Sequence, residues 1–185
     1  MTTSREIRLK SRPVGLPKAS DFELASVDLP APGAGEVQVK NLWMSVDPYM
    51  RGRMYDRPSY VPPFQIGQAL QGGAIGEVIA SNDPDFKPGD IVSSMFGWRE
   101  AFNANPKSLA AAGMGAITKL DTHGIPPQAF LGVVGMPGLT AYVGLLRISA
   151  LKEGDVVFVS AAAGAVGSVV CQIAKLKGHT VIGSA

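Results

Sequence analysis

The sequence predicts an α/β protein whose first part is rich in β-strands and whose last part is one strand–turn–helix–strand unit. Glycine and proline account for 22 and 14 of the 185 residues, which indicates short strands joined by tight turns. Near Gly135 the pattern of apolar residues changes, because short alternating segments give way to longer apolar runs. We therefore expect one domain over residues 1–134 and the incomplete start of a second over residues 135–185.

The first part contains four segments with the alternation or the β-branched content of strands. These segments are 36–46, 72–81, 89–98 and 111–120. A turn-rich loop, NDPDFKPGD at 82–90, joins the second segment to the third, and the proline-rich stretches at 28–32 and 58–63 are expected in loops. This arrangement is typical of a compact all-β or α+β domain.

The last part begins with a helix predicted over 137–148, where a proline stands in the first turn of an apolar run. The continuous β-branched run at 154–160 predicts a strand buried on both faces of a parallel sheet. A second helix over 163–178, ending at Gly178, and a second strand over 179–185 follow. One such βαβ unit does not make a domain, so we expect further strands of the sheet outside this sequence.

Composition narrows the class of protein. A hydrophobic fraction of 46% and a charged fraction of 17% allow a buried core, and a net charge of +2 does not favour nucleic acid or an acidic membrane as partner. One cysteine allows no internal disulfide and suits a reducing compartment. The start, MTTSREIRLK, lacks the apolar stretch of a signal peptide, and we find no apolar run of membrane-spanning length. We expect a cytoplasmic protein.

The segment VSAAAGAVGS at 159–168 predicts a turn that binds the pyrophosphate of a nucleotide. The fingerprint G-x-G-x-x-G follows a strand and opens a helix. Here alanine replaces the first glycine, while Gly164 would let the backbone approach the pyrophosphate and Gly167 would let the helix pack closely. The helix N-terminus would supply free amide donors. The alternative is a packing turn of small residues without a ligand.

The end of the second strand favours NADP over NAD. An NAD site usually places an acidic residue about 20 positions after the turn, where it binds the ribose 2′-hydroxyl. Counting from Gly167 leads to Gly183, Ser184 or Ala185, and none of these is acidic. Without a carboxylate to repel it, a 2′-phosphate can be accepted.

A metal site has few candidate ligands in this sequence. Cys171, His123 and His179 are its only cysteine and histidines, so we expect no zinc site. The two histidines are expected on the surface. Cys171 lies inside the predicted helix and is expected to be a buried structural thiol.

Several segments resemble the zinc-independent medium-chain dehydrogenase/reductases. They are LKSRPVGLPKASDFEL (9–24), MSVDPYMRGRM (44–54), GQALQGGAIGEVIAS (67–81), GMPGLTAYVGL (135–145) and the glycine turn. Within that superfamily the chain is most similar to prostaglandin reductases, alkenal double-bond reductases and bacterial NADPH-dependent curcumin reductases. Family members are nearly twice as long. The chain thus resembles their N-terminal part, a GroES-like catalytic domain followed by the first βαβ of a Rossmann domain.

The resemblance implies an NADPH-dependent reductase, usually homodimeric, that reduces the carbon–carbon double bond of an α,β-unsaturated aldehyde or ketone without a metal. Tyr49 matches a tyrosine of the substrate pocket whose hydroxyl can donate to the carbonyl oxygen; its alternative role is aromatic packing. Tyr60 is a weaker pocket candidate. Arg51 and Arg53 could hold an acidic substrate tail or the cofactor, or could serve structural ion pairs.

The resemblance also assigns residues to the cofactor. Met136 and Thr140 match the segment that approaches the nicotinamide, although both could equally pack and cap a helix. Gly164, Ala165, Val166 and Gly167 match the pyrophosphate turn.

Two alternatives remain at this point. The first is a quinone reductase of the same superfamily. The second is a non-catalytic fragment or binding module, in which the 185-residue chain uses its GroES-like domain alone. By itself, the chain of 185 residues is expected to be inactive.

Overall fold

The computed structural model describes residues 1–111 and 116–185 and divides into two units, Met1–His123 and Gly124–Ala185. This division comes before the boundary expected at 134/135. The reason is that the 3-10 helix η2 (Pro127–Leu131) contacts the helix α3 (Met136–Val143) within the second unit. The N–H of Gly138, for example, donates to the carbonyl of Gly132 over 3.2 Å.

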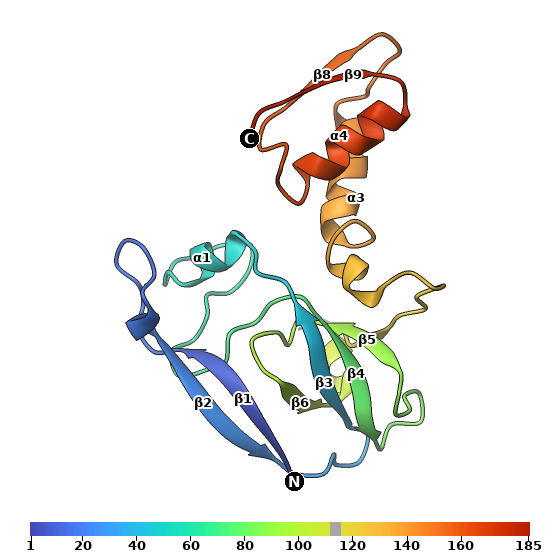
Figure 1. The fold of residues 1–185 in the computed structure, drawn as a ribbon. Helices are drawn as coiled ribbons and strands as arrows, with labels where there is room; N and C mark the ends of the chain where they lie inside the picture. The colour runs from blue at the N-terminus through green and yellow to red at the C-terminus, as the bar shows by residue number, and fades with distance from the viewer. Residues whose placement is uncertain (112–115) are drawn as a thin grey trace. The chain divides into compact units, whose positions relative to one another are not determined.

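The first unit is built on an antiparallel sheet of five strands with the order β6-β3-β4-β5-β7 (Figure 1). The strands are β3 (Val37–Met44), β4 (Ala74–Ser81), β5 (Ile91–Ser94), β6 (Ala101–Ala104) and β7 (Thr118–Lys119). One face of the sheet covers a core that includes Val37, Val39, Val78 and Val92. Alternation along the strands places these valines on the same face, which is why the pattern predicted the strands.

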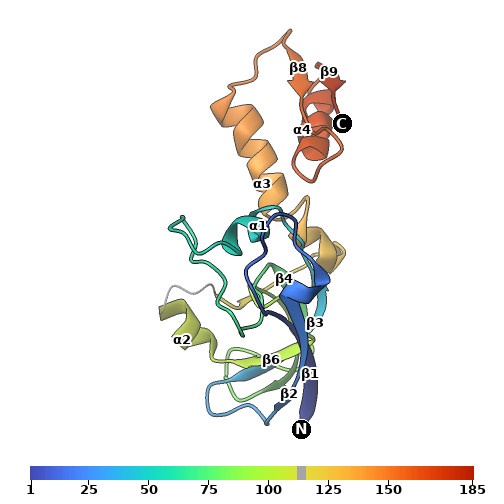
Figure 2. The same ribbon diagram turned by 90° about the vertical axis from the view of Figure 1, so that its left-hand side faces the viewer.

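The four predicted strand segments are confirmed as β3, β4, β5 and β7. Residues 112–115 of the last segment lie outside the described residues, and β7 occupies only its end. The short strand β6 was not predicted, because AFNA is too brief to show a period. The helix α2 (Pro106–Ala111), visible in Figure 2, follows β6 and was also missed.

A hairpin at the start of the chain was missed as well. Strands β1 (Thr2–Leu9) and β2 (Phe22–Leu29) pair antiparallel, with the short 3-10 helix η1 (Ala19–Asp21) between them. In β1 only Ile7 and Leu9 are apolar, so this segment gives little indication of a strand. Leu9 is nevertheless fully buried in a second core cluster with Met50, Phe64 and Leu70. Met50 belongs to the short helix α1 (Tyr49–Arg53).

The second unit contains the predicted strand–turn–helix–strand unit. Strand β8 (Val156–Val159) is followed by the helix α4 (Gly167–Leu176) and by strand β9 (Thr180–Gly183), and the two strands pair in parallel. The helix ends as predicted at Gly178, whose φ of +85° suits glycine. It begins at Gly167 rather than at 163, because the preceding residues form the turn. The predicted helix over 137–148 is present as α3 and a π-helical segment, Gly144–Ile148.

One expectation about β8 was wrong. The strand is not buried on both faces, since Val156 and Phe158 are 61% and 66% exposed. Among the described strands β8 pairs with β9 alone. One face of this pair is therefore an apolar surface that no other element of the unit covers.

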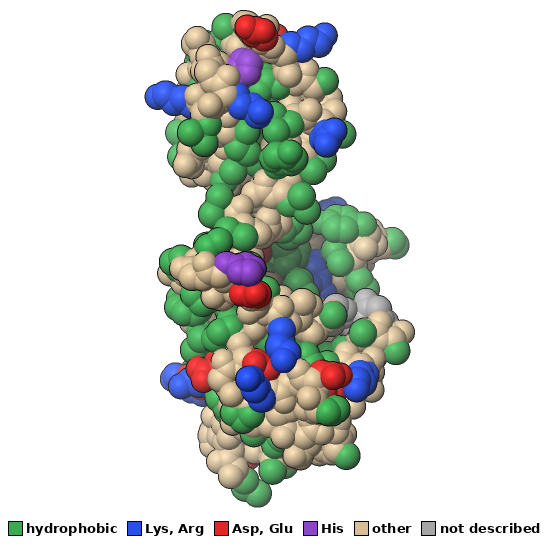
Figure 3. Space-filling model, turned by 90° about the vertical axis from the view of Figure 1, so that its right-hand side faces the viewer, with side chains coloured by type: hydrophobic (Ala, Val, Ile, Leu, Met, Phe, Trp, Pro, Cys, Tyr) green, Lys and Arg blue, Asp and Glu red, His purple; other side chains and the backbone are tan. Residues whose placement is uncertain are grey.

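Charges of both signs are interspersed over the first unit on the face drawn in Figure 3. Ion pairs of this unit include Lys119 with Asp90 at 3.0 Å and Lys107 with Asp85 at 3.2 Å. None of the helices in the described residues combines the length and the apolar character that crossing a membrane requires.

Candidate functional site

Tyr49 lies at the start of α1 and is half-buried. The turn before it is closed by two hydrogen bonds of 3.1 Å, from the N–H of Met50 to the carbonyl of Asp47 and from the N–H of Arg51 to that of Pro48. Met50 anchors the helix, because its side chain is 3% exposed within the second core cluster. The Tyr49 ring packs against the same cluster. The position of Tyr49 is thus set by packing.

Burial raises the pKa of Tyr49 above its ordinary value of 10.0. The charge of Asp47 adds to this shift, Arg53 opposes it, and Tyr60 makes a smaller contribution in the raising direction. The phenol consequently keeps its proton throughout the neutral range and can act as a hydrogen-bond donor.

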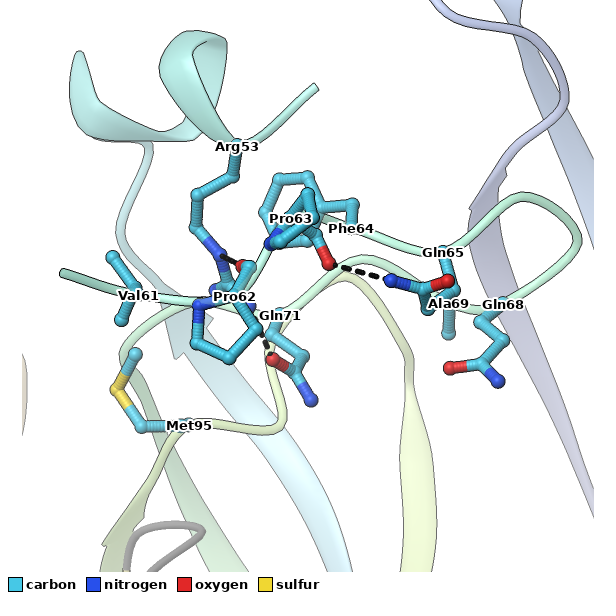
Figure 4. Close-up of a pocket in the computed structure, with 10 residues that line it drawn as sticks. All are labelled: Arg53, Val61, Pro62, Pro63, Phe64, Gln65, Gln68, Ala69, Gln71 and Met95. Carbon is cyan, nitrogen blue, oxygen red and sulfur yellow. Dashed lines mark hydrogen bonds between the residues drawn. The ribbon is translucent and has the colours of Figure 1, made fainter. Parts of the chain in front are cut away.

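A pocket of about 420 Å³ opens beside α1, and the residue of α1 that lines it is Arg53 (Figure 4). Its Nε donates to the carbonyl of Pro62 over 2.9 Å and its Nη2 to the Oε1 of Gln71 over 2.8 Å. The guanidinium carbon also lies 4.1 Å from the centre of the Phe64 ring. Met95 closes another side of the pocket. These contacts hold Arg53 in one orientation.

None of the three predicted substrate-pocket residues, Tyr49, Tyr60 and Arg51, lines this pocket. Arg51 donates from Nη2 to the carbonyl of Gly15 over 2.5 Å and to the hydroxyl of Tyr55 over 2.9 Å, and its guanidinium carbon lies 4.2 Å from the Tyr55 ring centre. These contacts support the structural alternative for Arg51. Tyr60 is 86% exposed on the loop that follows α1.

The glycine turn between β8 and α4 leaves backbone donors free. Within the described residues, no protein acceptor is present for the N–H groups of Ala165, Val166 and Gly167. Residues 163–166 are exposed. The N–H groups at a helix start, together with the helix dipole, attract phosphate. This turn could therefore hold the pyrophosphate of a dinucleotide.

Gly167 is required by the geometry of the turn. A Cβ at this position would lie 2.2 Å from the carbonyl oxygen of Ala161 and 3.0 Å from the Cα of Ala162. The close packing expected of the third glycine is thus observed, although the contact is with the turn rather than with the strand. At Gly164 a Cβ would lie 3.1 Å from the Ala161 oxygen and 4.0 Å from the Ala161 Cβ.

The end of β9 lies beside this turn. The N–H of Ala162 donates to the carbonyl of Ser184 over 2.8 Å, and the N–H of Ser184 donates to Val159 over 2.9 Å. A side chain on Gly183 would touch the Cβ of Ala162, at 2.8 Å. The positions at which the sequence lacks an acidic residue are therefore next to the turn.

Met136 and Thr140 lie one helical turn apart on α3, and both are exposed. The Thr140 hydroxyl donates to the carbonyl of Met136 over 2.7 Å. The hydroxyl is thus already bonded to its own helix, while the Met136 side chain, 66% exposed, is open to a ligand.

The cysteine and the histidines do not line the pocket beside α1. His123 is exposed near Asp121, at 3.4 Å, and the Nδ1 of His179 lies 3.2 Å from the carbonyl of Asp155. Cys171 is half-buried, so it is less enclosed than expected. In residues 1–111 and 116–185, no three His, Cys, Asp or Glu side chains gather as metal ligands would.

Residues 5–112 match the sequence family described as the N-terminal domain of oxidoreductase. The match covers more than half of the chain and includes the whole five-stranded sheet except β7. The chain belongs to this oxidoreductase family.

Longer similarities extend over both units. The NADPH-dependent curcumin reductase of Escherichia coli is 45% identical over 177 residues, which are 96% of this chain and 49% of that protein. The NADP⁺-dependent 2-alkenal reductase of Nicotiana tabacum is 41% identical over 187 residues, 99% of this chain and 52% of that protein. The chain spans about half the length of the curated relatives it matches.

A solved structure agrees with this fold. The crystal structure of CurA from Vibrio vulnificus in complex with NADPH matches with a TM-score of 0.84 at 46% identity, over 97% of this chain and 51% of that one. The predicted fold class, a β-rich GroES-like domain followed by a βαβ unit, is confirmed.

The sequence pattern did not distinguish Arg53 from Arg51 as a residue that could hold the substrate or the cofactor. The signal that separates the two is helical spacing. On α1, Arg53 is four residues after Tyr49 and three after Met50, so these side chains share a face, whereas Arg51 points elsewhere. Because α1 was not predicted, this difference could not be used.

Proposed function

We propose that this chain is the N-terminal part of an NADPH-dependent reductase that reduces the carbon–carbon double bond of α,β-unsaturated aldehydes and ketones. The observation that carries this proposal is the similarity, over both units, to the curcumin reductase and the 2-alkenal reductase. The free N–H groups of the glycine turn support it independently.

Residues 135–185, which make up most of the second unit, are proposed as the start of a Rossmann domain for NADP. In this proposal the N–H groups of Ala165, Val166 and Gly167 bind the pyrophosphate, and Gly164 leaves room for it. Met136 and Thr140 contribute to the nicotinamide side. The absence of a carboxylate at 183–185, beside the turn, supports NADP over NAD.

NADPH, when bound, supplies the hydride that reaches the β-carbon of the substrate. The electron pair of the double bond then moves toward the carbonyl, and an enolate oxygen develops. We propose that the Tyr49 hydroxyl donates a hydrogen bond to this oxygen, since its raised pKa keeps the phenol protonated. A proton taken up from solvent at the α-carbon then gives the saturated carbonyl product.

The same donor makes a metal unnecessary in this proposal. A zinc ion in related chemistry stabilises the negative oxygen as a Lewis acid. Hydrogen-bond donors serve this purpose here.

Homodimer formation and a cytoplasmic location stay predictions.

The test uses the full-length protein that contains this chain. NADPH consumption should accompany conversion of an alkenal to the saturated aldehyde, and NADH should be used much less well. The saturated aldehyde supplied as substrate should not consume NADPH. Reduction of that aldehyde to an alcohol, without action on the alkenal, would contradict the proposal. Faster turnover of a quinone than of any enal or enone would favour the quinone reductase.

A further inference from the structure

The pocket beside α1 contains a buried arginine that forms no ion pair with a carboxylate of the described residues. Arg53 is 8% exposed, and its hydrogen-bond acceptors, the Pro62 carbonyl and the Gln71 amide, are both neutral. The Phe64 ring below the guanidinium carries no net charge either. These contacts orient the guanidinium and leave its positive charge uncompensated.

No acidic side chain of residues 1–111 and 116–185 forms an ion pair with Arg53. Residues 112–115 have the sequence Ala-Gly-Met-Gly and contain no acid. Burial lowers the pKa of Arg53, yet a guanidinium stays charged in proteins. A buried charge is costly unless an opposite charge compensates it, so an anion in this pocket would be stabilised.

The rest of the pocket selects the remainder of the ligand. Its volume of about 420 Å³ lies in the usual range for sites of small organic molecules. Val61, Pro62, Phe64 and Met95 form apolar walls, and Gln71 is the polar group next to Arg53 (Figure 4). The Nη1 of Arg53 makes no hydrogen bond within the described residues, so it can donate to a ligand.

We propose that this pocket binds a small monocarboxylate with an apolar chain. The carboxylate pairs with the Arg53 guanidinium, and the chain packs on Val61, Pro62 and Met95. The proposal does not depend on the reductase activity, because every residue involved belongs to the first unit and none belongs to the proposed cofactor site.

The 185-residue chain, labelled with ¹⁵N, can be titrated with hexanoate and with its neutral isostere hexanamide, without NADPH. We expect hexanoate to bind at least about tenfold more tightly, because hydrogen bonds between two charged groups are the stronger ones. The amide signals of Val61, Phe64 and Gln71 should shift together. Equal affinities for the two compounds, or shifts confined to other residues, would overturn the proposal.

Two variants and one control complete the test. Arg53→Gln should reduce hexanoate binding to the level of hexanamide. Arg57→Gln should not change hexanoate binding, because Arg57 is exposed and its guanidinium carbon lies 5.0 Å from the Tyr55 ring centre. If Arg53→Gln does not fold, Met95→Trp decides the question: it keeps Arg53, fills the pocket and should weaken both ligands. Undiminished hexanoate binding in a folded Arg53→Gln or Met95→Trp variant refutes the site.

Discussion

At the scale of single residues, the burial of Tyr49 affects both its position and its pKa. Its ring contacts the second core cluster, and this burial is the largest cause of its raised pKa. The same contact therefore holds the side chain in place and keeps its hydroxyl protonated. A surface tyrosine such as Tyr60, which is 86% exposed, lacks such packing.

We predict that Tyr49→Phe lowers kcat of the full-length enzyme by about 10²-fold, the usual effect of removing a donor to a developing oxyanion. Steady-state kinetics measure this, and Tyr60→Phe is the matched control. A kcat unchanged by Tyr49→Phe would remove the tyrosine from the mechanism.

The raised pKa of Tyr49 also predicts an effect of pH on stability. Above pH 10.0 the unfolded chain releases this proton more readily than the folded one, so the folded state loses stability as pH rises through that range. Urea unfolding at several alkaline pH values should show a smaller loss for Tyr49→Phe. The same slope in both proteins would show that Tyr49 titrates normally.

Gly167 allows the backbone of the turn to pack closely against it. We predict that Gly167→Ala lowers the free energy of unfolding by roughly 1–3 kcal/mol, the range for overpacking, because its Cβ would meet backbone atoms that cannot move aside. Gly144→Ala is the control, since no atom lies within 4 Å of a Cβ there. Urea unfolding of both variants measures the difference; equal stability would show that the turn is free to adjust.

At the scale of elements, α1 is held by its side chains. Five residues are too few to form a stable helix alone, and Met50 supplies its buried anchor. That anchor occupies the space above Gly72: a Cβ on Gly72 would lie 2.3 Å from the Met50 Cε. The side chain of Met50 on α1 therefore packs directly against Gly72, just before β4.

This fit predicts non-additive substitutions. Met50→Ala should cost about 2–5 kcal/mol as a cavity substitution, and Gly72→Ala should also destabilise. In the double variant the clash with the Met50 methyl is gone, so the two effects should couple by about 0.5–3 kcal/mol. A double-mutant cycle by urea unfolding measures this. Strict additivity would mean that Met50 moves away from Gly72 at no cost.

At the scale of the whole molecule, the strand pair of the second unit exposes large apolar side chains. Val156, Phe158 and Ile182 are 61%, 66% and 52% exposed, and Phe158 is paired with Ile182 across the two strands. Such a surface favours association.

We predict that the 185-residue chain self-associates as its concentration rises and that Phe158→Lys reduces this. Val14→Lys is the control, because Val14 is 94% exposed but lies in a loop of the first unit. Sedimentation velocity over a range of concentrations measures the effect. Monomers at every concentration would show that this apolar face is tolerated in water.

Much of the fold could be predicted from local patterns. Strand β3 begins with alternating apolar and polar residues, and β4 and β5 contain β-branched residues. The βαβ unit combines a β-branched run with a small-residue turn and a helix that stops before Gly178. The hairpin β1–β2 could not be found in this way. Its burial comes from distant residues, such as Ala101, whose backbone exchanges two hydrogen bonds with the Ser4 hydroxyl, of 2.8 and 2.9 Å.

The sequence by itself determined the succession of β3, β4 and β5, the βαβ unit, its glycine turn and the lack of an acid after it, because these depend on neighbouring residues. Only the tertiary structure decided which arginine of DPYMRGRM enters a pocket and which binds a loop. That choice depends on the face of α1 that packs on the second core cluster. The tertiary structure also explains why residue 167 must be glycine, because the carbonyl of Ala161 occupies the space that a Cβ would need.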